Sequence, residues 1–211
     1  MGANLKEGGV NSQDVQRVIR CAEMYDKDFA GRAMLFVLTD RDKNVTTLEV
    51  KFDGSNFQHL TGMSSSRYKS KKDFFRACQK GSVRAGDIGI KKFTRQKLQG
   101  LLIVLQSPDL HASMKGDYNR SGRDLEADVM LGNHQWTMGF KRINNSPYVP
   151  KTMLKEDIRK LTNRTLSVVA VYRRRQCERE YREIICKSNK VDFAKLKFPA
   201  DWKERNLPPL V

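Results

Sequence analysis

Two strand-like runs separated by a short polar turn constrain the fold of this chain most strongly. The runs cover residues 33–39 and 45–52, and the five polar residues between them supply turn chemistry. Before them, apolar residues at helical spacing predict a helix that Ser12 can cap and that ends near Gly31. A helix followed by an antiparallel hairpin is typical of an α+β fold.

Further strand-like runs lie in the second half of the chain. Residues 125–131 and 135–143 are predicted to form a second hairpin, and residues 166–172 and 181–186 to complete the sheet. Segment 107–123 is interpreted as an irregular surface loop, and Thr152 as the cap of a helix. We therefore predict an α+β fold with an antiparallel sheet of about five to six strands, an N-terminal helix and a basic helical insertion.

A chain of 211 residues is long enough to bury one sizeable core. We expect a single domain over residues 1–211, with its core at about 12–190, the basic helical insertion at about 67–106 and a C-terminal extension at 191–211. No stretch reaches the roughly 18 consecutive apolar residues that a membrane-spanning helix needs. The polar first segment also lacks the apolar centre of a signal peptide. We therefore expect a cytoplasmic protein without a membrane partner.

Positive charge dominates the composition. Lys and Arg number 40 against 24 Asp and Glu, which gives a formal net charge of +16. Such an excess indicates a polyanionic partner, with nucleic acid the first candidate and an anionic membrane surface the second. Any one cation within residues 67–97 is consistent with an ordinary solvated helix face, but the local excess of eleven Lys and Arg over two Asp favours binding. From this stretch we predict that five side chains bind substrate: Lys71, Lys72, Lys91, Lys92 and Lys97.

The sequence contains no strong metal or cofactor motif. Its cysteines stand singly, without a Cys-x-x-Cys pair, so neither a zinc site nor a disulfide framework is expected. The sequence lacks a glycine loop that cradles phosphates, a nucleophile elbow and a His-Glu-x-x-His zinc motif. We expect no cofactor and no metal.

One acidic pattern keeps a metal-dependent hypothesis open. Asp124, Glu126 and Asp128 alternate, so on a strand their carboxylates would share one face, as a metal-dependent DNA nuclease would require. An acidic stripe that stays solvated or pairs with neighbouring arginines is the commoner outcome of such a pattern.

A histidine beside a hydroxyl and a glycine is the strongest candidate for chemistry. The segment Phe57-Gln58-His59-Leu60-Thr61-Gly62 is interpreted as the end of a strand-like run. Imidazole has an unperturbed pKa near neutrality, so His59 is a candidate for proton transfer on a phosphodiester. The alternative is a half-buried, hydrogen-bonded structural histidine.

The order of these segments resembles a known group of nucleases. An N-terminal helix, a hairpin, the segment Asn-Phe-Gln-His-Leu-Thr-Gly at 56–62, a helical insertion and a Tyr148-x-Pro150-x-Thr152 segment follow one another. Over roughly residues 20–190 this layout resembles the phage-associated nuclease families of the barnase, EndoU, colicin E5/D and RelE fold, in particular the fourth such family. His59 and Thr61 match its motif, and Tyr148 and Thr152 match its later proline-flanked segment.

The resemblance implies a metal-independent endoribonuclease of phage or prophage conflict systems. RNA is then its substrate, and an immunity or antitoxin protein is a further partner. In the implied mechanism a general base removes the 2′-OH proton of RNA, and the ribose oxygen attacks the neighbouring phosphorus. We expect His59 to act as acid or base, with Thr61 and Thr152 as positioning hydroxyls.

Four further residues complete the predicted site on the basis of this sequence alone. Lys141 and Arg142 are expected to stabilise the phosphate. Tyr148 and Trp136 are candidate stacking platforms for bases, although each can equally well belong to the core. The rival function is a non-catalytic basic nucleic-acid-binding or inhibitor protein of phage origin. Substituting His59 by Ala distinguishes the two, because binding spread over many phosphates does not depend on one imidazole.

Overall fold

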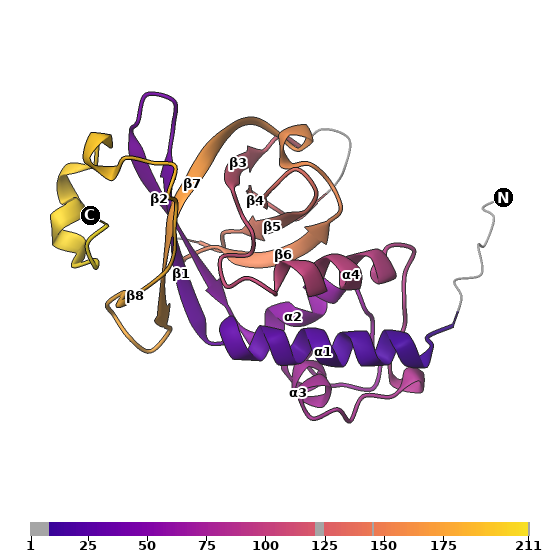
Figure 1. Ribbon diagram of the computed structural model, residues 1–211. Helices are drawn as coiled ribbons and strands as arrows, with labels where there is room; N and C mark the ends of the chain where they lie inside the picture. The colour runs from indigo at the N-terminus through magenta and orange to yellow at the C-terminus, as the bar shows by residue number, and fades with distance from the viewer. Residues whose placement is uncertain (1–8, 121–124, 145, 211) are drawn as a thin grey trace.

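The computed structural model describes residues 9–120, 125–144 and 146–210 of the chain. Figure 1 shows four helices gathered on one side of a curved sheet. The helices and strands follow in the order α1 (Ser12–Asp28), β1 (Arg32–Thr39), β2 (Val45–Phe52), α2 (Gly54–Thr61), α3 (Lys71–Gln79), α4 (Thr94–Val104), β3 (Met114–Tyr118), β4 (Val129–Gly132), β5 (Thr137–Lys141), β6 (Val149–Leu154), β7 (Thr162–Arg175) and β8 (Glu183–Lys187). Short 3-10 helices form at η1 (Ala85–Asp87), η2 (Ile158–Lys160), η3 (Phe193–Lys195) and η4 (Ala200–Arg205).

The strands form one antiparallel sheet in the order β2-β1-β7-β3-β4-β5-β6, with β8 also paired to β7. The long strand β7 joins the pair β2-β1 to the strands β3 to β6. On one edge its residues 167–175 pair with β1. On the other edge its residues 162–167 pair with β3, and residues 170–173 pair with β8. The predicted α+β fold with an N-terminal helix and an antiparallel sheet is confirmed, and the sheet has eight strands instead of five to six.

Two of the strands lie where the sequence patterns predict other structure. β3 falls inside the predicted surface loop, because Gly116 and a register shift between Gly116 and Tyr118 hide its alternation. The helix predicted to start at Thr152 is wrong: Thr152 lies in β6 and pairs with Gly139 of β5. Pro150 precedes it at a register shift, which tolerates a residue without a backbone N–H.

The histidine segment is helical, so its interpretation as a strand end is wrong. α2 begins after Asp53, whose side chain accepts a backbone N–H of the first turn, while the N–H of Asp53 donates to Asn56 Oδ1 at 2.8 Å. Phe57 and Leu60 lie three residues apart and both are buried. A single helical turn therefore buries the two apolar residues of a segment too short to show its period.

α1 is the predicted N-terminal helix, but Asn11 is its cap instead of Ser12, which is its first residue. Asn11 Oδ1 accepts the N–H of Asp14 at 2.9 Å, and Asp14 Oδ2 accepts the N–H of Asn11 at 3.2 Å. The same buried carboxylate accepts hydrogen bonds from the guanidinium of Arg95, from Nε at 3.1 Å and 3.2 Å to its two oxygens and from Nη2 at 2.9 Å. Because Arg95 belongs to α4, this pair fastens α4 to the start of α1.

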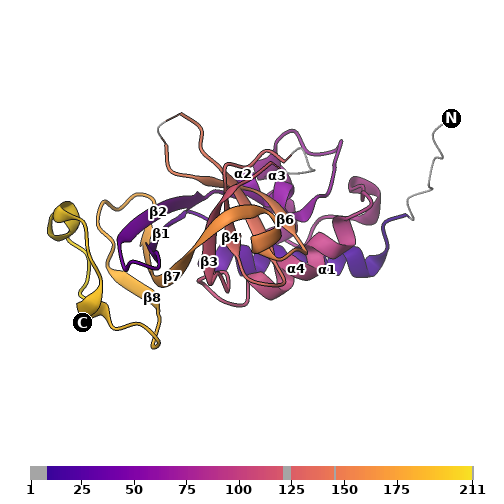
Figure 2. The ribbon, with the colours of Figure 1, turned by 90° about the horizontal axis from the view of Figure 1, so that it is seen from above.

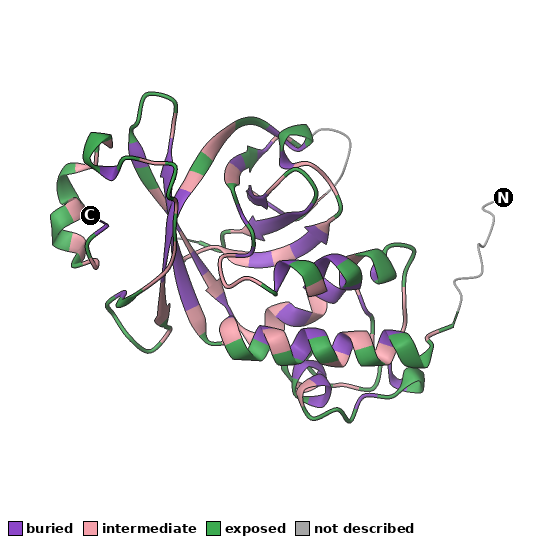
Figure 3. Ribbon diagram, viewed as in Figure 1, coloured by how far each residue is buried: buried purple, intermediate pink, exposed green. Residues whose placement is uncertain are grey.

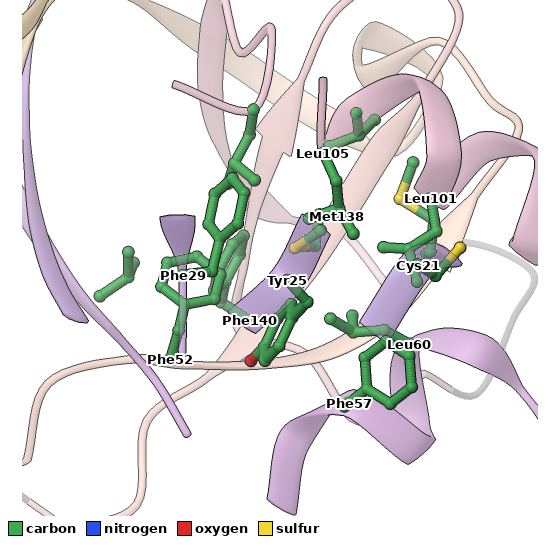
Figure 4. Packing of buried hydrophobic residues seen from close by; sticks show 14 of the residues in the cluster. Cys21, Tyr25, Phe29, Phe52, Phe57, Leu60, Leu101, Leu105, Met138 and Phe140 are labelled. Carbon is green, nitrogen blue, oxygen red and sulfur yellow. The ribbon is translucent and has the colours of Figure 1, made fainter. Parts of the chain in front are cut away.

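An aromatic cluster joins the helices to the sheet. The ring of Tyr25 lies 5.4 Å from that of Phe57, and the ring of Phe29 lies 5.3 Å from that of Phe52. Figure 4 shows these rings with Phe140 of β5 between α1 and the strands. Burial of rings of this size is among the largest stabilising contributions a core residue makes. The cluster therefore fixes α2 on the sheet.

Successive side chains of β1 point to opposite faces of the sheet and belong to two different hydrophobic clusters. Phe36 packs under the helices, whereas Leu35 and Val37 pack under the C-terminal segment together with Phe193 and Leu210. The views in Figures 1 and 2 agree that the C-terminal segment lies on the side of the sheet away from α1 to α4. In Figure 3 the strands between these layers are largely buried, and the exposed positions follow the outer faces of the helices.

The ends of the sheet meet beside α2. Tyr148, just before β6, forms a parallel bridge with Val50 of β2. Its N–H donates to Glu49 O at 3.1 Å, and its carbonyl accepts the N–H of Lys51 at 2.8 Å. This junction holds β6 against α2 and α4. Among the described residues, no helix has both the length and the apolar character to cross a membrane.

Candidate active site

α2 divides the segment of residues 57–62 between the core and a cavity. The residues at helical spacing on its inner face are buried: Phe57, Leu60 and Thr61. Gln58 and His59 face the other way and line a cavity of about 510 Å³. The sequence of α2 therefore turns the imidazole towards solvent by burying its neighbours.

The cavity is strongly cationic. It lies between α2, the start of α3, the loop that leads into α4, and β6. Of the described residues that line it, four are lysines and none is acidic. Low-dielectric walls with charges of one sign concentrate the field and attract anions. The side chains that matter for its chemistry are His59, Lys71, Lys91, Phe93, Lys97 and Lys151.

The surroundings of His59 favour its neutral form. Lys71 Nζ lies 2.6 Å from His59 Nε2. An ammonium group can only donate, so Nε2 is the acceptor and the ring proton resides on Nδ1. Burial, followed by the charge of Lys71, lowers the pKa of His59 below its usual value of 6.5. A neutral imidazole at neutral pH is the form that a general base requires.

Lys97 is placed by contacts on both sides. Its Nζ donates to Thr152 Oγ1 at 3.1 Å. Its side chain crosses Gly62, where an added Cβ would lie 2.9 Å from Lys97 Cδ. Thr94 Oγ1 donates to Gly62 O at 2.9 Å, which ties the end of α2 to the start of α4. Burial, with the charge of Lys91 second, lowers the pKa of Lys97.

Lys151 reaches the cavity because β6 contains a bulge. The register between β5 and β6 shifts between Gly139 and Phe140, which leaves Lys151 as the extra residue. Bulges redirect side chains and recur beside active sites. Lys151 Nζ lies 3.6 Å from Glu126 Oε2, and the lysine side chain is 19% exposed against 72% for the glutamate. Glu126 is thus the acidic group that faces this cation from outside the cavity.

Asp87 joins the loops on the α3 side of the cavity. Its carboxylate accepts from the Arg67 guanidinium at 2.6 Å, the Arg84 N–H at 2.9 Å and the Tyr68 hydroxyl at 3.3 Å. Its carbonyl accepts from the Ser65 hydroxyl at 2.6 Å. Because Ser65 lines the cavity, this network fixes that wall.

The structure brings only part of the predicted catalytic group together. His59 lines the cavity, and Thr152 contacts it through Lys97. Thr61 is fully buried; its hydroxyl donates to Gln58 O at 2.8 Å and accepts the N–H of Met63 at 3.2 Å. It therefore stabilises the end of α2, behind His59.

Lys141 and Arg142 lie outside the group of residues that line this cavity. The Arg142 guanidinium donates to Ser146 O at 3.0 Å and lies 5.7 Å from the ring centroid of Tyr148. The backbone N–H of Arg142 donates to Asp128 Oδ2 at 2.8 Å. These contacts hold Arg142 and Tyr148 at the junction of β2 and β6.

Three of the five predicted substrate-binding lysines line the cavity: Lys71, Lys91 and Lys97. Lys72 forms an ion pair with Asp53 at 3.4 Å instead. The Lys92 ammonium lies 5.5 Å from the ring centroid of Phe93 at the cavity rim. The basic stretch of residues 67–97 thus contributes lysines to the cavity from near its start and near its end.

Trp136 and the acidic triplet lie elsewhere. Trp136 is buried and packs so closely on Gly100 that an added Cβ there would lie 2.3 Å from its ring. Asp124 lies outside the described residues. Glu126 and Asp128 precede β4 and make the two contacts already described, with Lys151 and Arg142. Within the described parts of the chain, no group of three or more His, Cys, Asp or Glu residues is arranged to hold a metal.

Of the six cavity side chains singled out above, Lys151 and Phe93 were not among the predicted site residues. Lys151 follows a proline in a segment interpreted as a helix start, and only the bulge in β6 shows where it points. Phe93 follows a lysine pair, and its spacing with Leu98 and Leu101 predicts the apolar side of a helix, whereas the structure leaves it exposed. Basic residues interleaved with an aromatic are the signal that could have identified it.

The family comparison covers the whole of this cavity. A model of the family described as phage-Barnase-EndoU-ColicinE5/D-RelE like nuclease4 matches residues 17–202. The chain belongs to this family. No curated protein and no solved structure matches the chain. Membership in the phage-Barnase-EndoU-ColicinE5/D-RelE like nuclease4 family makes the protein a phage-associated nuclease, and a nucleic acid is the corresponding substrate.

Proposed function

We propose that the protein is a metal-independent endoribonuclease that cleaves RNA through its 2′-OH. One observation carries the proposal: the imidazole of His59, with Lys71 Nζ 2.6 Å from its Nε2, faces a cavity lined by four lysines. Cleavage of RNA requires a base for the 2′-OH and positive charge for the phosphorane. Both are present in this single cavity.

The contact between Lys71 and His59 defines the first step. In the free protein the ammonium of Lys71 occupies His59 Nε2. A substrate phosphate competes for that ammonium, which frees Nε2 to accept the 2′-OH proton. The 2′-oxygen then attacks phosphorus and the bond to the 5′-oxygen breaks. The products are a 2′,3′-cyclic phosphate and a chain with a free 5′-OH.

The remaining lysines supply charge and a proton. Lys91, Lys97 and Lys151 surround the position of the phosphate in this proposal. The lowered pKa of Lys97, caused mainly by burial, makes it a better donor to the leaving 5′-oxygen than an ordinary lysine. Thr152 holds its ammonium in place. Because RNA carries its own nucleophile and the lysines carry the charge, the mechanism calls for no metal.

The other residues of the predicted catalytic group lie outside the cavity. Thr61 ends α2 directly behind His59. Lys141 and Arg142 are left out of the catalytic group, because Arg142 is engaged with Ser146 and Tyr148. A toxin role in phage conflict, a cytoplasmic location and an immunity partner stay predictions.

The decisive experiment compares a short labelled RNA with its 2′-deoxy counterpart, both in the presence of a chelator. The enzyme forms are the wild type, His59→Asn and the matched control His111→Asn. His111 is exposed, and its backbone φ of +49° is one that Asn tolerates well. Thermal unfolding of all three proteins checks that the substitutions leave the fold intact.

We expect cleavage of the RNA alone, with a cyclic phosphate on the product. His59→Asn should lower the rate by roughly 10² to 10⁴, and His111→Asn should leave it unchanged. Equal activity of His59→Asn and wild type would overturn the assignment of the base. Activity lost in the chelator would overturn metal independence. Tight, salt-sensitive binding of both oligonucleotides without cleavage would establish the rival binding protein.

A further inference from the structure

Phe93 exposes its ring at the rim of the cavity. The residue is 57% exposed, and the exposed large hydrophobic residues of the described chain are Phe93, Ile103 and Ile143. Phe93 is the one aromatic of these three, and it also lines the lysine-rich cavity. An aromatic ring left in water beside a strongly cationic hollow calls for a specific partner.

The position of Phe93 in α4 strengthens this point. Phe93 is the N-cap of α4, and its side chain makes no capping hydrogen bond. Ser, Thr, Asp and Asn are the residues that stabilise this position. A residue that breaks a local rule without a packing gain marks a functional position.

The backbone that carries the ring is nonetheless fixed by its neighbours. Thr94 is buried; its hydroxyl donates to Gly62 O at 2.9 Å and accepts the N–H of Lys91 at 2.8 Å. Lys97 N–H donates to Phe93 O at 2.9 Å. The backbone on both sides of Phe93 is therefore held to the end of α2, close to His59.

The charges around the ring match a nucleic-acid strand. Lys92 Nζ lies 5.5 Å from the ring centroid, and Lys91 and Lys97 line the same cavity. Single-stranded nucleic acids are bound where basic side chains follow the phosphates and aromatic rings accept the bases by stacking. This combination distinguishes a nucleobase from a purely apolar partner, which would not need the cations.

We propose that Phe93 is the stacking platform for a base adjacent to the phosphate held in the cavity. The occupant is a nucleotide of single-stranded RNA, recognised by its π-face and so with little preference among bases. The inference rests on the proposed function in one respect, that the lysine-lined cavity receives a phosphate. It replaces Trp136 and Tyr148, which lie in the core and at the strand junction, as the aromatic contact to substrate.

The test separates stacking from phosphate binding. The ligand is a short 2′-O-methyl RNA, which lacks the nucleophilic hydroxyl, with one 2-aminopurine in a sequence of otherwise ordinary bases. Its partner ligand has the same sugar-phosphate backbone with abasic sites in place of the bases. Dissociation constants of both are measured with wild type, Phe93→Ser, Phe93→Trp and the control Ile143→Ser. Ser is a favourable N-cap residue, so Phe93→Ser should keep α4 folded, which thermal unfolding verifies.

Wild type should bind the base-containing ligand about 5- to 150-fold more tightly than the abasic one and quench the 2-aminopurine. Phe93→Ser should abolish this preference without weakening abasic binding, Phe93→Trp should preserve it, and Ile143→Ser should resemble wild type. Equal affinity of wild type for both ligands, or no binding of either, would overturn the assignment and favour a protein partner for the ring. Cleavage without a Phe93 effect would reject the platform and keep the ribonuclease. A Phe93-dependent preference without cleavage of ordinary RNA would keep the platform and reject the ribonuclease.

Discussion

Gly62 offers a sharp test of the geometry around Lys97. Three glycines that shortly follow helices have left-handed backbone angles, with φ of +73° at Gly31, +68° at Gly62 and +63° at Gly81. A side chain in this conformation costs roughly 1–2 kcal/mol, partly offset because Ala restricts the unfolded chain by about 0.4–1 kcal/mol. Each Gly→Ala substitution should therefore lower the free energy of unfolding by about 1 kcal/mol.

Gly62 differs from the other two in what surrounds it. A Cβ at Gly62 would lie 2.9 Å from Lys97 Cδ, whereas at Gly31 and Gly81 nothing lies within 4 Å. Lys97 must move, and its 3.1 Å hydrogen bond to Thr152 weakens or breaks. For a partly exposed charged donor this adds about 1 kcal/mol. We expect about 2 kcal/mol for Gly62→Ala against about 1 kcal/mol for each control.

Urea unfolding measures the stability of the three variants, with an unchanged m-value as evidence for an unchanged unfolding reaction. RNA cleavage by the same proteins measures the position of Lys97. A displacement of about 1 Å in a positioned group can cost about 10²-fold in rate. We expect Gly62→Ala to be about 10- to 100-fold slower than wild type, with Gly31→Ala and Gly81→Ala near wild type. If all three variants agree in stability and rate, the contact between Gly62 and Lys97 has no role.

Three other predictions follow from contacts described above. The rate of RNA cleavage should fall on the acid side with a midpoint below 6.5, since burial lowers the pKa of His59; a midpoint at or above 6.5 would contradict catalysis by its neutral form. Gly100→Ala should lower the free energy of unfolding by about 2 kcal/mol, measured by urea unfolding, because its Cβ would lie 2.3 Å from Trp136. This loss should exceed the gain from the better helix propensity of Ala, and a net gain in stability would refute the contact. Asp14→Asn should cost about 2 kcal/mol at pH 7 through lost hydrogen bonds to Arg95. Because the Arg95 guanidinium lowers the pKa of Asp14, this cost should shrink as pH falls below about 3.9, and a cost independent of pH would argue against the charged pair.

The fold from α1 to β2 was predictable because these elements follow local rules. The apolar spacing of α1 and the runs that became β1 and β2 have the periods of their elements, and the turn between them is polar. β3 and β6 were missed because a register shift interrupts the alternation of each, after Gly116 in β3 and at Lys151 in β6. α2 was missed because eight residues are too few to establish a helical period.

The candidate site was predictable only where one residue type carries the chemistry. His59 could be identified because imidazole titrates near neutrality, and several lysines because their local excess was large. The sequence could not show that Lys151, instead of Arg142, points into the cavity, because a bulge decides that direction. Nor could it show that the Thr61 hydroxyl turns back to Gln58, since that follows from the end of α2.

The junction at Tyr148 also determines how other chains can approach the protein. Outward-facing backbone groups of an edge strand are a template for the addition of a further strand. Several of those groups on β2 are already used: Tyr148 bonds to Glu49 and Lys51, and the carbonyl of Lys197 accepts the N–H of Val45 at 3.0 Å. The protein thus shields both ends of β2 against edge-to-edge aggregation with its own chain.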